Sequence, residues 1–310
     1  MTIEKNTKIN RKKVQEIVRS QSNKTMIAVF CEYQMPNDFF APLKNLKFQI
    51  FQGDTSDNKT NRAKLSNFVC KCLEKLGGVV AAIADTHVDK GGYFIGIDLG
   101  HTTHGEEKFS NFATVIFDHR GLFIGSYVVE KIPQQENLNE NHCILAFKEL
   151  AFILEGKNLQ RPKSIVVHRD GKLHSADISS LKNALNNVWG EITIDIVEII
   201  KSGFPIIAMK DDKGKVINPK SGYSYQDNEH RYSILVTNTQ ADEHSVVINP
   251  IIVKHKYWNT DFNKIVDQVY WFTKIYTNNL YNSTRLPATT LKANNIVGTS
   301  IKQHKPTYLG

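Results

Sequence analysis

The sequence predicts an α/β protein built from two successive blocks of strands and helices. Three observations lead to this prediction. Short apolar runs, such as those at 25–30 and 164–168, recur along the chain and are typical of buried strands. Longer segments predicted to be helical lie between them. Of the 310 residues, 41% are hydrophobic and 23% are charged, which supplies a buried core and excludes a disordered chain.

The first block covers residues 1–88 and is predicted to be a small layered domain. Its first strand is the apolar run at 25–30, and a second strand follows at 47–51, where apolar and polar residues alternate. After a polar loop, a helix is predicted over 63–76, and Gly77–Gly78 form a usual helix stop. The order strand, strand, helix, strand is typical of an α/β layer arrangement.

The polar stretch 85–92 separates this block from the second, which covers residues 89–310. The second block begins with three strands, of which the last two form a hairpin, and continues with alternating helices and strands. Strands are predicted at 93–99, 112–118, 122–129, 164–168, 192–200, 231–237 and 246–253. Helices are predicted at 139–154, 175–188 and 261–277. Three successive strands followed by this alternation resemble an RNase H-type domain.

Charge and cysteine content narrow the class of protein. The formal net charge of +8, with a pI near 9.1, favours a polyanionic partner such as nucleic acid, although a basic solubilising surface would give the same number. The four cysteines form no CxxC pair and no zinc-spaced cluster, which favours reduced thiols. No segment approaches the roughly 20 apolar residues that span a bilayer, and the basic N-terminus lacks the apolar core of a secretory signal. We therefore expect a cytoplasmic protein without a membrane partner.

Two aspartates follow apolar strands in the second block. Asp98 stands in the segment GIDLG and Asp170 in VVHRDG, each at the predicted end of a strand. Strand ends are where α/β sheets place ligands and catalytic groups, and two such carboxylates could share divalent ions that bracket a phosphoryl displacement. Mg²⁺ or Mn²⁺ suits these oxygen ligands. The alternative is that each aspartate caps the turn or helix that follows it.

The segments FIGIDLG and HRDG resemble the PIWI domain of Argonaute proteins, which is an RNase H-fold nuclease. The active site of that family is a tetrad. The resemblance places Asp98 at its first position and Asp170 at its third. Between them, KIPQQENL resembles the segment of the family's glutamate finger, which places Glu136 at the second position. Glu130 and Glu140 are nearby alternatives outside that motif.

The fourth tetrad position falls in RLPATTLKANNIV, which resembles the family's LPAP segment near the C-terminus. Counting from Pro287 places the metal-ligating residue at Asn294, with Asn295 as the alternative if the alignment shifts by one. An amide oxygen can bind a hard cation but contributes no charge, so we expect weaker metal binding than with aspartate. The resemblance therefore implies Asp98, Asp170 and Asn294 as ligands for Mg²⁺ or Mn²⁺.

The first block resembles the Rossmann-like MID domain, which binds the 5′ end of the guide strand. The run SNFVCKCLEKLGG follows the family pattern and places Lys71 and Lys75 four residues apart on one helix face, where both can contact one phosphate. The alternative is a solvated lysine face. Upstream, DFFAPLK resembles the family's tyrosine–lysine motif, with phenylalanine where a tyrosine stacks on the first base. The resemblance assigns to this 5′-phosphate pocket Phe40, Lys44, Gln49, Gln52, Lys71, Lys75 and, through the C-terminal carboxylate, Gly310.

The resemblance as a whole implies the MID–PIWI portion of a prokaryotic-type Argonaute, in a short or split form that lacks the N-terminal and PAZ domains. The expected partners are a short 5′-phosphorylated guide DNA or RNA and a complementary target strand, which the chain cleaves in a metal-dependent reaction. Either a separate subunit supplies the missing lobe or a minimal form works alone. Two alternatives stay open: a guide-binding module that acts through a partner subunit or effector, and an unguided relative of RNase H or the resolvases. Lys201 and Arg285 are expected to line the guide channel.

Overall fold

The computed structural model describes residues 27–31, 48–52, 58–76, 78–104, 107–133, 138–203, 207–238, 248–275 and 284–303. At 27–31, 48–52, 58–63, 102–104, 107 and 301–303 it describes the backbone alone. The chain divides between Ala81 and Ala82 into two compact units, each of which is described by itself. Among the helices of these described ranges, none is long and apolar enough to cross a membrane.

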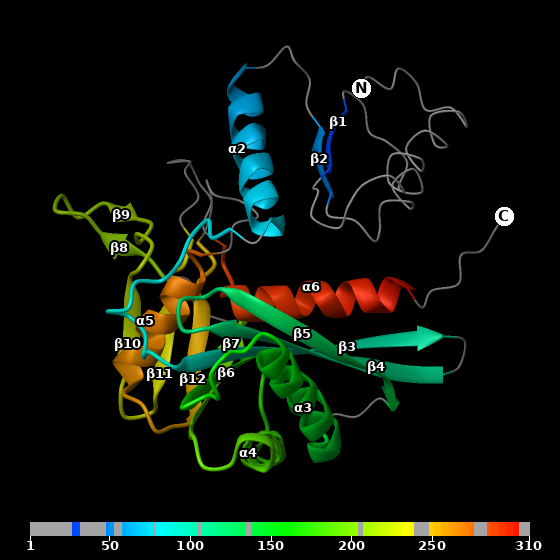
Figure 1. Ribbon diagram of the computed structural model, residues 1–310. Coiled ribbons are helices and arrows are strands. Elements are labelled where there is room, and N and C mark those ends of the chain that lie inside the picture. Colours follow the sequence, from blue (N-terminus) through cyan, green and yellow to red (C-terminus); the bar gives the residue numbers. More distant parts are fainter. Residues whose placement is uncertain are drawn as a thin grey trace. The chain divides into compact units, whose positions relative to one another are not determined.

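The first unit contains two strands and a long helix (Figure 1). Strands β1 (Ile27–Cys31) and β2 (Phe48–Gln52) pair in parallel, as an α/β arrangement requires, and α2 (Asn58–Lys75) lies against β2. Both strands were predicted within two residues of their observed bounds. The helix begins five residues earlier than predicted, because the segment 58–62 is entirely polar and gives no hydrophobic period to detect.

The second unit is built on an eight-stranded sheet with the order β10-β11-β12-β7-β6-β3-β4-β5 (Figure 1). Its strands are β3 (Gly92–His104), β4 (Glu107–Asp118), β5 (Phe123–Pro133), β6 (Ser164–Asp170), β7 (Thr193–Ile200), β10 (Ser224–Asp227), β11 (Tyr232–Leu235) and β12 (Ile251–Tyr257). Strands β3, β4 and β5 pair antiparallel, whereas β6 pairs in parallel with both β3 and β7. This is the RNase H-like α/β fold that the order of elements in the sequence predicted.

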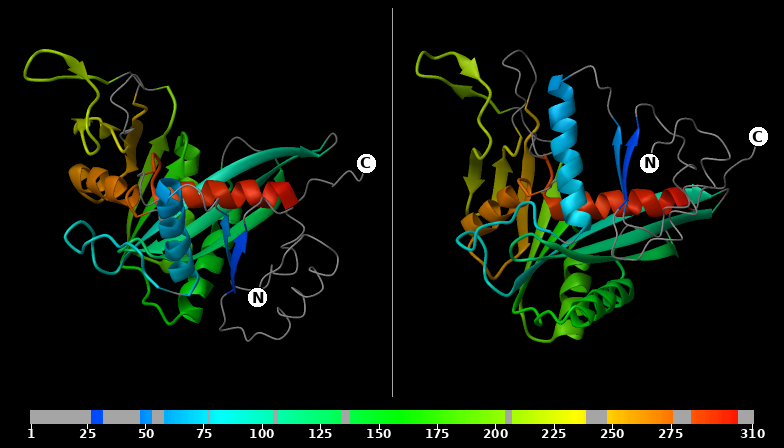
Figure 2. Two further views of the ribbon diagram at one scale, coloured as in Figure 1. Left: turned by 90° about the horizontal axis from the view of Figure 1, so that it is seen from above. Right: turned by 45° about the horizontal axis from the view of Figure 1, so that its top comes forward.

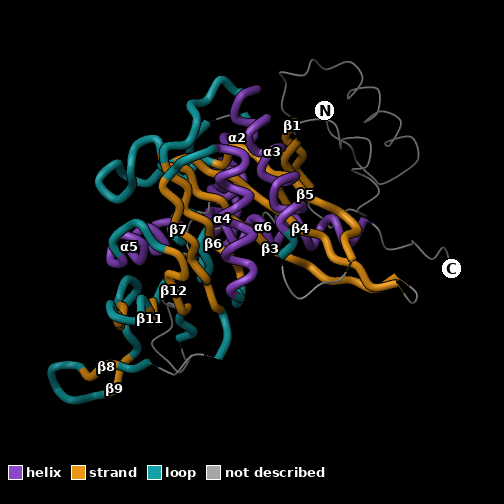
Figure 3. Tube along the Cα trace, turned by 90° about the horizontal axis from the view of Figure 1, so that it is seen from below, coloured by secondary structure: helices purple, strands orange, loops and turns teal. Residues whose placement is uncertain are grey.

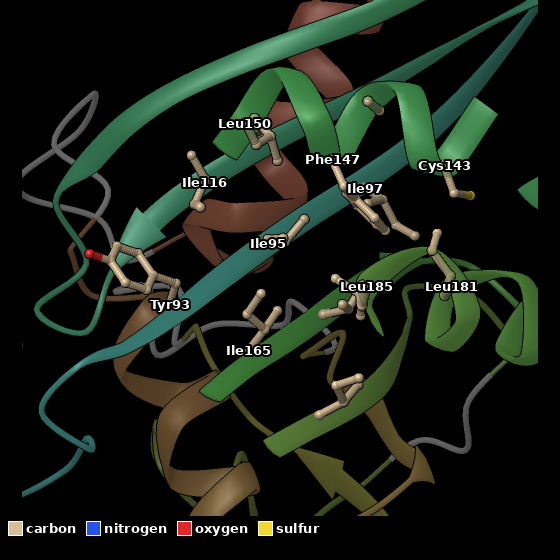
Figure 4. Close-up of a cluster of buried hydrophobic side chains, with 14 of the residues drawn as sticks. Tyr93, Ile95, Ile97, Ile116, Cys143, Phe147, Leu150, Ile165, Leu181 and Leu185 are labelled. Carbon is tan, nitrogen blue, oxygen red and sulfur yellow. The ribbon is translucent and has the colours of Figure 1, made fainter. Parts of the chain in front are cut away.

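Helices cover both faces of this sheet, and each face has its own apolar core. Helices α3 (Glu140–Gly156) and α4 (Ser175–Trp189) lie together over one face (Figure 3), where they bury side chains of β3, β4 and β6. Figure 4 shows this core, with Ile95 and Ile97 of β3 facing Phe147 of α3 and Leu181 of α4. Helices α5 (Phe262–Phe272) and α6 (Ala288–Gln303) cover the opposite face. Because β3 is covered on both sides, the position of its residues is tightly determined.

Several elements differ from the prediction. Strand β3 continues to His104, because the polar run after 99 still pairs with β4 through its backbone. Strand β12 begins at Ile251, after Pro250, which has no N–H to donate to the ladder. Helix α6 and the short strands β8 (Met209–Lys210), β9 (Val216–Ile217) and β10 were not predicted. The β8–β9 hairpin extends away from the sheet in both views of Figure 2.

Candidate active site

Asp98 and Asp170 lie on neighbouring parallel strands. The pairing of β3 with β6 ends at Ile97↔Arg169, so the two aspartates are the next residues on each strand. The prediction that each aspartate ends its strand is correct for Asp170, which is the last residue of β6. It is wrong for Asp98, because β3 continues for six more residues beside β4 after its pairing with β6 has ended. Asp98 therefore projects from a rigid strand rather than from a loop.

The backbone conformation directly after Asp170 explains why residue 171 is a glycine. Its backbone has a φ of 94°, a left-handed conformation that residues with a side chain rarely adopt. Its N–H donates to the carbonyl oxygen of Ile199 on β7 at 2.9 Å, so the chain turns while still bonded to the sheet. This turn fixes the backbone immediately after the Asp170 carboxylate.

Each of the two carboxylates forms an ion pair with a neighbouring cation. The Arg169 guanidinium lies 3.2 Å from Asp98 Oδ1, and the Lys201 ammonium lies 2.8 Å from Asp170 Oδ2. The Asp98 and Asp170 side chains are only 13% and 4% exposed, so water screens the attraction within these pairs less than at the surface, but burial also removes hydration from the charges. Lys201 follows directly after β7, and the Arg285 guanidinium donates to its backbone carbonyl. Both residues expected in the guide channel are thus adjacent to this site.

Burial raises the pKa of Asp98, and the negative charge of Asp170 acts in the same direction. Arg169, the largest opposing influence, and the Leu99 N–H, which donates to Asp98 Oδ1 at 2.9 Å, do not cancel these effects. An ionised Asp98 is therefore under-compensated in this structure, and additional positive charge beside it would be favourable.

Helix α6 brings Asn294 to the same region of the sheet. The helix packs along β3, and a Cβ at Gly96 would lie 2.2 Å from the backbone oxygen of Thr289. Asn294 follows Thr289 by five residues, about 7.5 Å of helix, and Asp98 follows Gly96 by two residues, about 6.6 Å of strand. The two residues therefore lie at a similar level along the sheet. Asn294 is partly buried beside the fully buried Ala293, whereas the alternative, Asn295, is exposed.

Glu136 lies outside the described residues, and the description of the chain resumes at Leu138. Leu138 is buried, and its N–H donates to Asp177 Oδ1 at 2.6 Å. The other oxygen of Asp177 accepts from the N–H of His174 at 2.8 Å, in the loop that follows Asp170. Asp177 thus ties Leu138, two residues after Glu136 in the sequence, to the loop after Asp170. Sequence reasoning missed this residue, since an aspartate in the first turn of a helix looks like an ordinary helix-terminal carboxylate.

The two alternative glutamates have structural partners in the second unit. Glu130 accepts a hydrogen bond from Ser300 of α6 at 2.9 Å, and Glu140 accepts one from Asn183 of α4 at 3.0 Å. Each of these bonds joins a helix to a neighbouring element.

The donor atoms fit part of a divalent-metal site. Two adjacent carboxylates, of which Asp98 is under-compensated, suit a hard cation such as Mg²⁺ or Mn²⁺. Within the ranges that the structure describes, no group of three or more His, Cys, Asp or Glu residues is arranged to hold a metal. Further ligands would therefore have to come from an amide such as Asn294 or from residues beyond these ranges, among them Glu136.

The residues expected at the guide 5′ end belong to the first unit, apart from the C-terminal residue. Lys71 is partly buried and Lys75 is exposed on α2, and burial lowers the pKa of Lys75, with the Lys71 charge acting in the same direction. The two ammonium groups are thus close enough to repel each other. Gln49 and Gln52 lie on β2, where the backbone alone is described. Phe40, Lys44 and Gly310 lie outside the described residues.

Comparison with known proteins identifies the family. A family model described as "Piwi domain" matches residues 39–305, nearly the whole chain. The chain belongs to the Piwi-domain family. The match begins in the first compact unit and continues through the second.

The curated proteins that this Piwi-domain chain is similar to include two Argonautes. It is 26% identical over 250 residues to the protein argonaute of Aquifex aeolicus and 28% identical over 226 residues to that of Marinitoga hydrogenitolerans. These alignments cover 79% and 72% of the chain but 33% and 31% of the two relatives. The chain thus spans about a third of the length of the curated relatives it matches.

Solved Argonaute structures share the fold. The chain matches a Clostridium butyricum Argonaute bound to a guide DNA and a 19-mer target DNA with a TM-score of 0.74 and 23% identity, over 94% of this chain and 39% of that one. It matches an Aquifex aeolicus Argonaute with a TM-score of 0.64 and 23% identity, over 91% and 40% of the two chains. At these identities the likeness supports the fold, and the RNase H-like prediction for the second unit is confirmed.

Proposed function

We propose that this Piwi-domain chain binds the 5′ end of a short guide strand with its first unit and cleaves the paired target strand with its second. The observation that supports this most directly is the adjacent pair of carboxylates, the partly buried Asp98 and the buried Asp170, at the end of the β3–β6 pairing. The guide and target bound to the similar Clostridium butyricum Argonaute indicate the type of ligand. The same assignment makes residues 1–88 a MID-like domain and residues 89–310 a PIWI domain.

In this proposal Asp98, Asp170 and Asn294 hold the divalent ion, Mg²⁺ or Mn²⁺, and Glu136 completes the site. The ion, when bound, activates water and stabilises the leaving oxygen of the phosphodiester. Asp98 must lose its proton to bind a cation, which its raised pKa makes harder than for an ordinary aspartate. Asp170 would then share its charge with the ion, and the half-exposed Lys201 could pair with the backbone of the target.

The first unit supplies the positive charge for the guide. Lys71 and Lys75 lie on one helical face of α2, and their mutual repulsion would be relieved by a bound phosphate. Phe40, Lys44, Gln49, Gln52 and Gly310 are the other residues that we assign to this pocket. Recognition of a terminal phosphate would distinguish a guide from other single strands.

Cleavage of a labelled target strand tests the proposal. Purified protein is loaded with a 5′-phosphorylated guide, given Mn²⁺, and compared with Asp170→Ala and with Asp212→Ala, an exposed aspartate on the β8–β9 turn. A single cut at a position set by the guide, lost in Asp170→Ala and kept in Asp212→Ala, is the expected result. Cleavage that does not require the guide would contradict the proposal and favour an unguided nuclease.

A second candidate is a guide-binding module that acts through a partner or effector. The ion pairs of Asp98 with Arg169 and of Asp170 with Lys201 favour it, since each carboxylate already has a cationic side chain as its partner. The same assay separates the two candidates. Tight guide and target binding with no cut by the wild-type protein, in Mn²⁺ or in Mg²⁺, would assign the chemistry to a partner.

A further inference from the structure

A pocket of about 380 Å³ lies at the edge of the sheet away from the two carboxylates. Its walls come from β10, β11, β12 and the residue after β12, and the lining residues used below are Asp227, His230, Tyr232, Lys254, Lys256 and Trp258. Strand β7 separates β12 from β6, which carries Asp170. Along β7, Asp170 lies opposite Ile199. Tyr257, the residue before Trp258 of the pocket, lies opposite Ile196, which is three residues away from Ile199 on the same strand. The pocket is therefore a separate site from the carboxylate pair.

Three lining side chains project from one face of three adjacent strands. Asp227 is paired with Tyr232, and Tyr232 is paired with Lys254. Directly opposed residues in antiparallel strands point to the same side of a sheet. The Lys254 ammonium lies 5.8 Å from the centre of the Tyr232 ring, and Lys256 adds a second ammonium on the same wall.

Trp258 provides a flat aromatic surface, and the side chain of Arg231 packs against its ring. It is 54% exposed, and the Arg231 guanidinium lies 4.9 Å from the centre of its ring. The Arg231 guanidinium is itself 3.2 Å from His255 Nδ1, and His255 Nε2 is 2.8 Å from the buried Asp195. Arg231 adopts a φ of 49°, which is unusual for a residue with a side chain. This chain of contacts fixes the position of Trp258, which still lines the pocket and remains about half exposed.

The chemistry of this pocket suits one nucleotide of a single-stranded nucleic acid. A planar base can stack on an exposed tryptophan, and paired lysines bind the neighbouring phosphates. The pocket also contains the carboxylate of Asp227, but both of its oxygens accept bonds from His230, one from the backbone N–H and one from the ring, at 3.0 and 2.8 Å. The net charge of +8 on the chain favours a polyanion over a free neutral base.

We propose that the pocket formed by Tyr232, Lys254, Lys256 and Trp258 binds a nucleotide of single-stranded DNA or RNA. It is a second contact point, distinct from the guide 5′-end pocket and from the carboxylate pair. The inference deepens the proposed function, on which it rests for the choice of a polynucleotide ligand. The segment bound is one that is not base-paired, since stacking on Trp258 needs an open base face.

Tryptophan fluorescence tests the proposal on the full chain. The chain has three tryptophans, of which Trp189 is buried and Trp271 partly buried, so a single-stranded 5′-hydroxyl hexanucleotide should quench mainly Trp258. Trp258→Leu should weaken hexanucleotide binding, measured by anisotropy of a labelled strand, by about ten-fold. The control Phe152→Leu removes another exposed aromatic, on α3, and should bind like the wild type.

A matched pair of double variants separates the pocket from general charge. Lys254→Ala with Lys256→Ala should lower the dependence of log Kd on log salt by about 1.4, the value for two phosphate contacts on a single strand. Lys148→Ala with Lys157→Ala removes the same charge from exposed positions at α3 and should leave that slope almost unchanged. Equal loss in both double variants would overturn the proposal, as would unchanged quenching in Trp258→Leu. If Trp258→Leu fails to fold, the lysine pair decides.

Two further measurements distinguish nucleotide binding in this pocket from a simple anion site and from a failure of the proposed function. Inorganic phosphate that competes as well as the hexanucleotide would overturn it, because it would show an anion site without base stacking. Asp170→Ala should keep the quenching, since the pocket is separate. Absence of guided cleavage with quenching intact would refute the proposed function alone, whereas guided cleavage with no effect of Trp258→Leu on quenching would refute this inference alone.

Discussion

Ionisation of the Asp98 carboxyl is less favourable in the folded state than in the unfolded chain. Burial raises its pKa, the adjacent Asp170 adds to the effect, and Arg169 only partly offsets them. The folded chain therefore binds a proton at Asp98 more tightly than the unfolded chain does. By linkage, this residue makes folding less favourable as the pH rises from the ordinary aspartate pKa through the raised one, and the full cost is present above that window. A binding site is a common place for such a cost.

Asp98→Asn is therefore expected to raise the melting temperature at pH 7 while abolishing cleavage. The amide keeps the shape of the carboxylate without its charge, so the gain should shrink as the pH is lowered and the wild-type Asp98 becomes protonated. Thermal melts of both proteins between pH 4 and pH 8, without divalent ions, measure the difference. A gain that is the same at every pH would show that the charge of Asp98 is not its cause.

At the scale of elements, the arrangement around the candidate site depends on how closely α6 approaches β3. Gly96 has no side chain, and a Cβ there would lie 2.2 Å from the Thr289 backbone oxygen. The His168 ring on β6 contacts Thr289 Oγ1 at 2.8 Å, so two strands fix the same helical residue. Because the clash would be with backbone atoms of Thr289 and not with a flexible side chain, only a movement of the helix or the strand could relieve it. The glycine of the GID motif is therefore explained by helix packing, whereas the aspartate two residues later is the one that we propose as a metal ligand.

Gly96→Ala is expected to destabilise the fold by about 1–3 kcal/mol or more, since α6 would have to move away from β3. Gly298→Ala is the matched control, because a Cβ at this position in α6 meets no atom within 4 Å. That change should stabilise the protein by about 0.5–1 kcal/mol, because alanine is the better helix former. Denaturant unfolding of both variants measures the two effects, and equal effects would refute this account of Gly96.

Much of the second unit could be predicted from sequence because its strands are apolar runs bounded by turns. The edge strands of the sheet and helix α6 could not. Strand β10, with the sequence SYQD, has no apolar period, and it forms because β11 offers a backbone edge to pair with. Helix α6 has two threonines directly after its first residue, Ala288, and contains two asparagines and a glycine, so its helical propensity is weak. It is stabilised by packing on β3, which no local pattern reveals.

The candidate site was predictable to the extent that its residues stand in recognisable motifs. Asp98 and Asp170 were found in this way, and the structure places them side by side. Their pairing with Arg169 and Lys201 could not be predicted, because Lys201 lies 31 residues after Asp170 and reaches it only through the β6–β7 pairing. The role of Asp177 was hidden for the same reason, since its partner Leu138 is 39 residues away.

At the scale of the whole molecule, the proposal divides the work between two units. The first would recognise one end of the guide, and the second would act on the paired target. The net positive charge of the chain favours binding of any polyanion. Specificity for a guide end therefore has to come from particular groups in the first unit. Lys71 and Lys75 on α2 are the described candidates for this role.

Replacing both Lys71 and Lys75 by alanine is expected to weaken binding of 5′-phosphorylated guides by about 10- to 100-fold, the value of one or more charge-assisted hydrogen bonds. Binding of 5′-hydroxyl guides should change little. Filter binding of both guide forms measures the preference, with Lys148→Ala and Lys157→Ala as the charge-matched control. An equal loss for both guide forms would place the 5′ phosphate elsewhere.

The dependence of β3 on α6 also has a consequence for the synthesis of the chain. Thr289 follows Gly96 by 193 residues (289 minus 96), so a ribosome makes the helix roughly 10–40 s after the strand at about 5–20 residues per second. During that interval, Phe94 and Val115, which lie in the same buried cluster as Ala293 of α6, lack this cover. The nascent sheet exposes this apolar face until α6 emerges, and such a surface favours aggregation. We therefore expect the yield of folded protein to depend on how quickly α6 reaches the sheet, as well as on the stability of the finished fold.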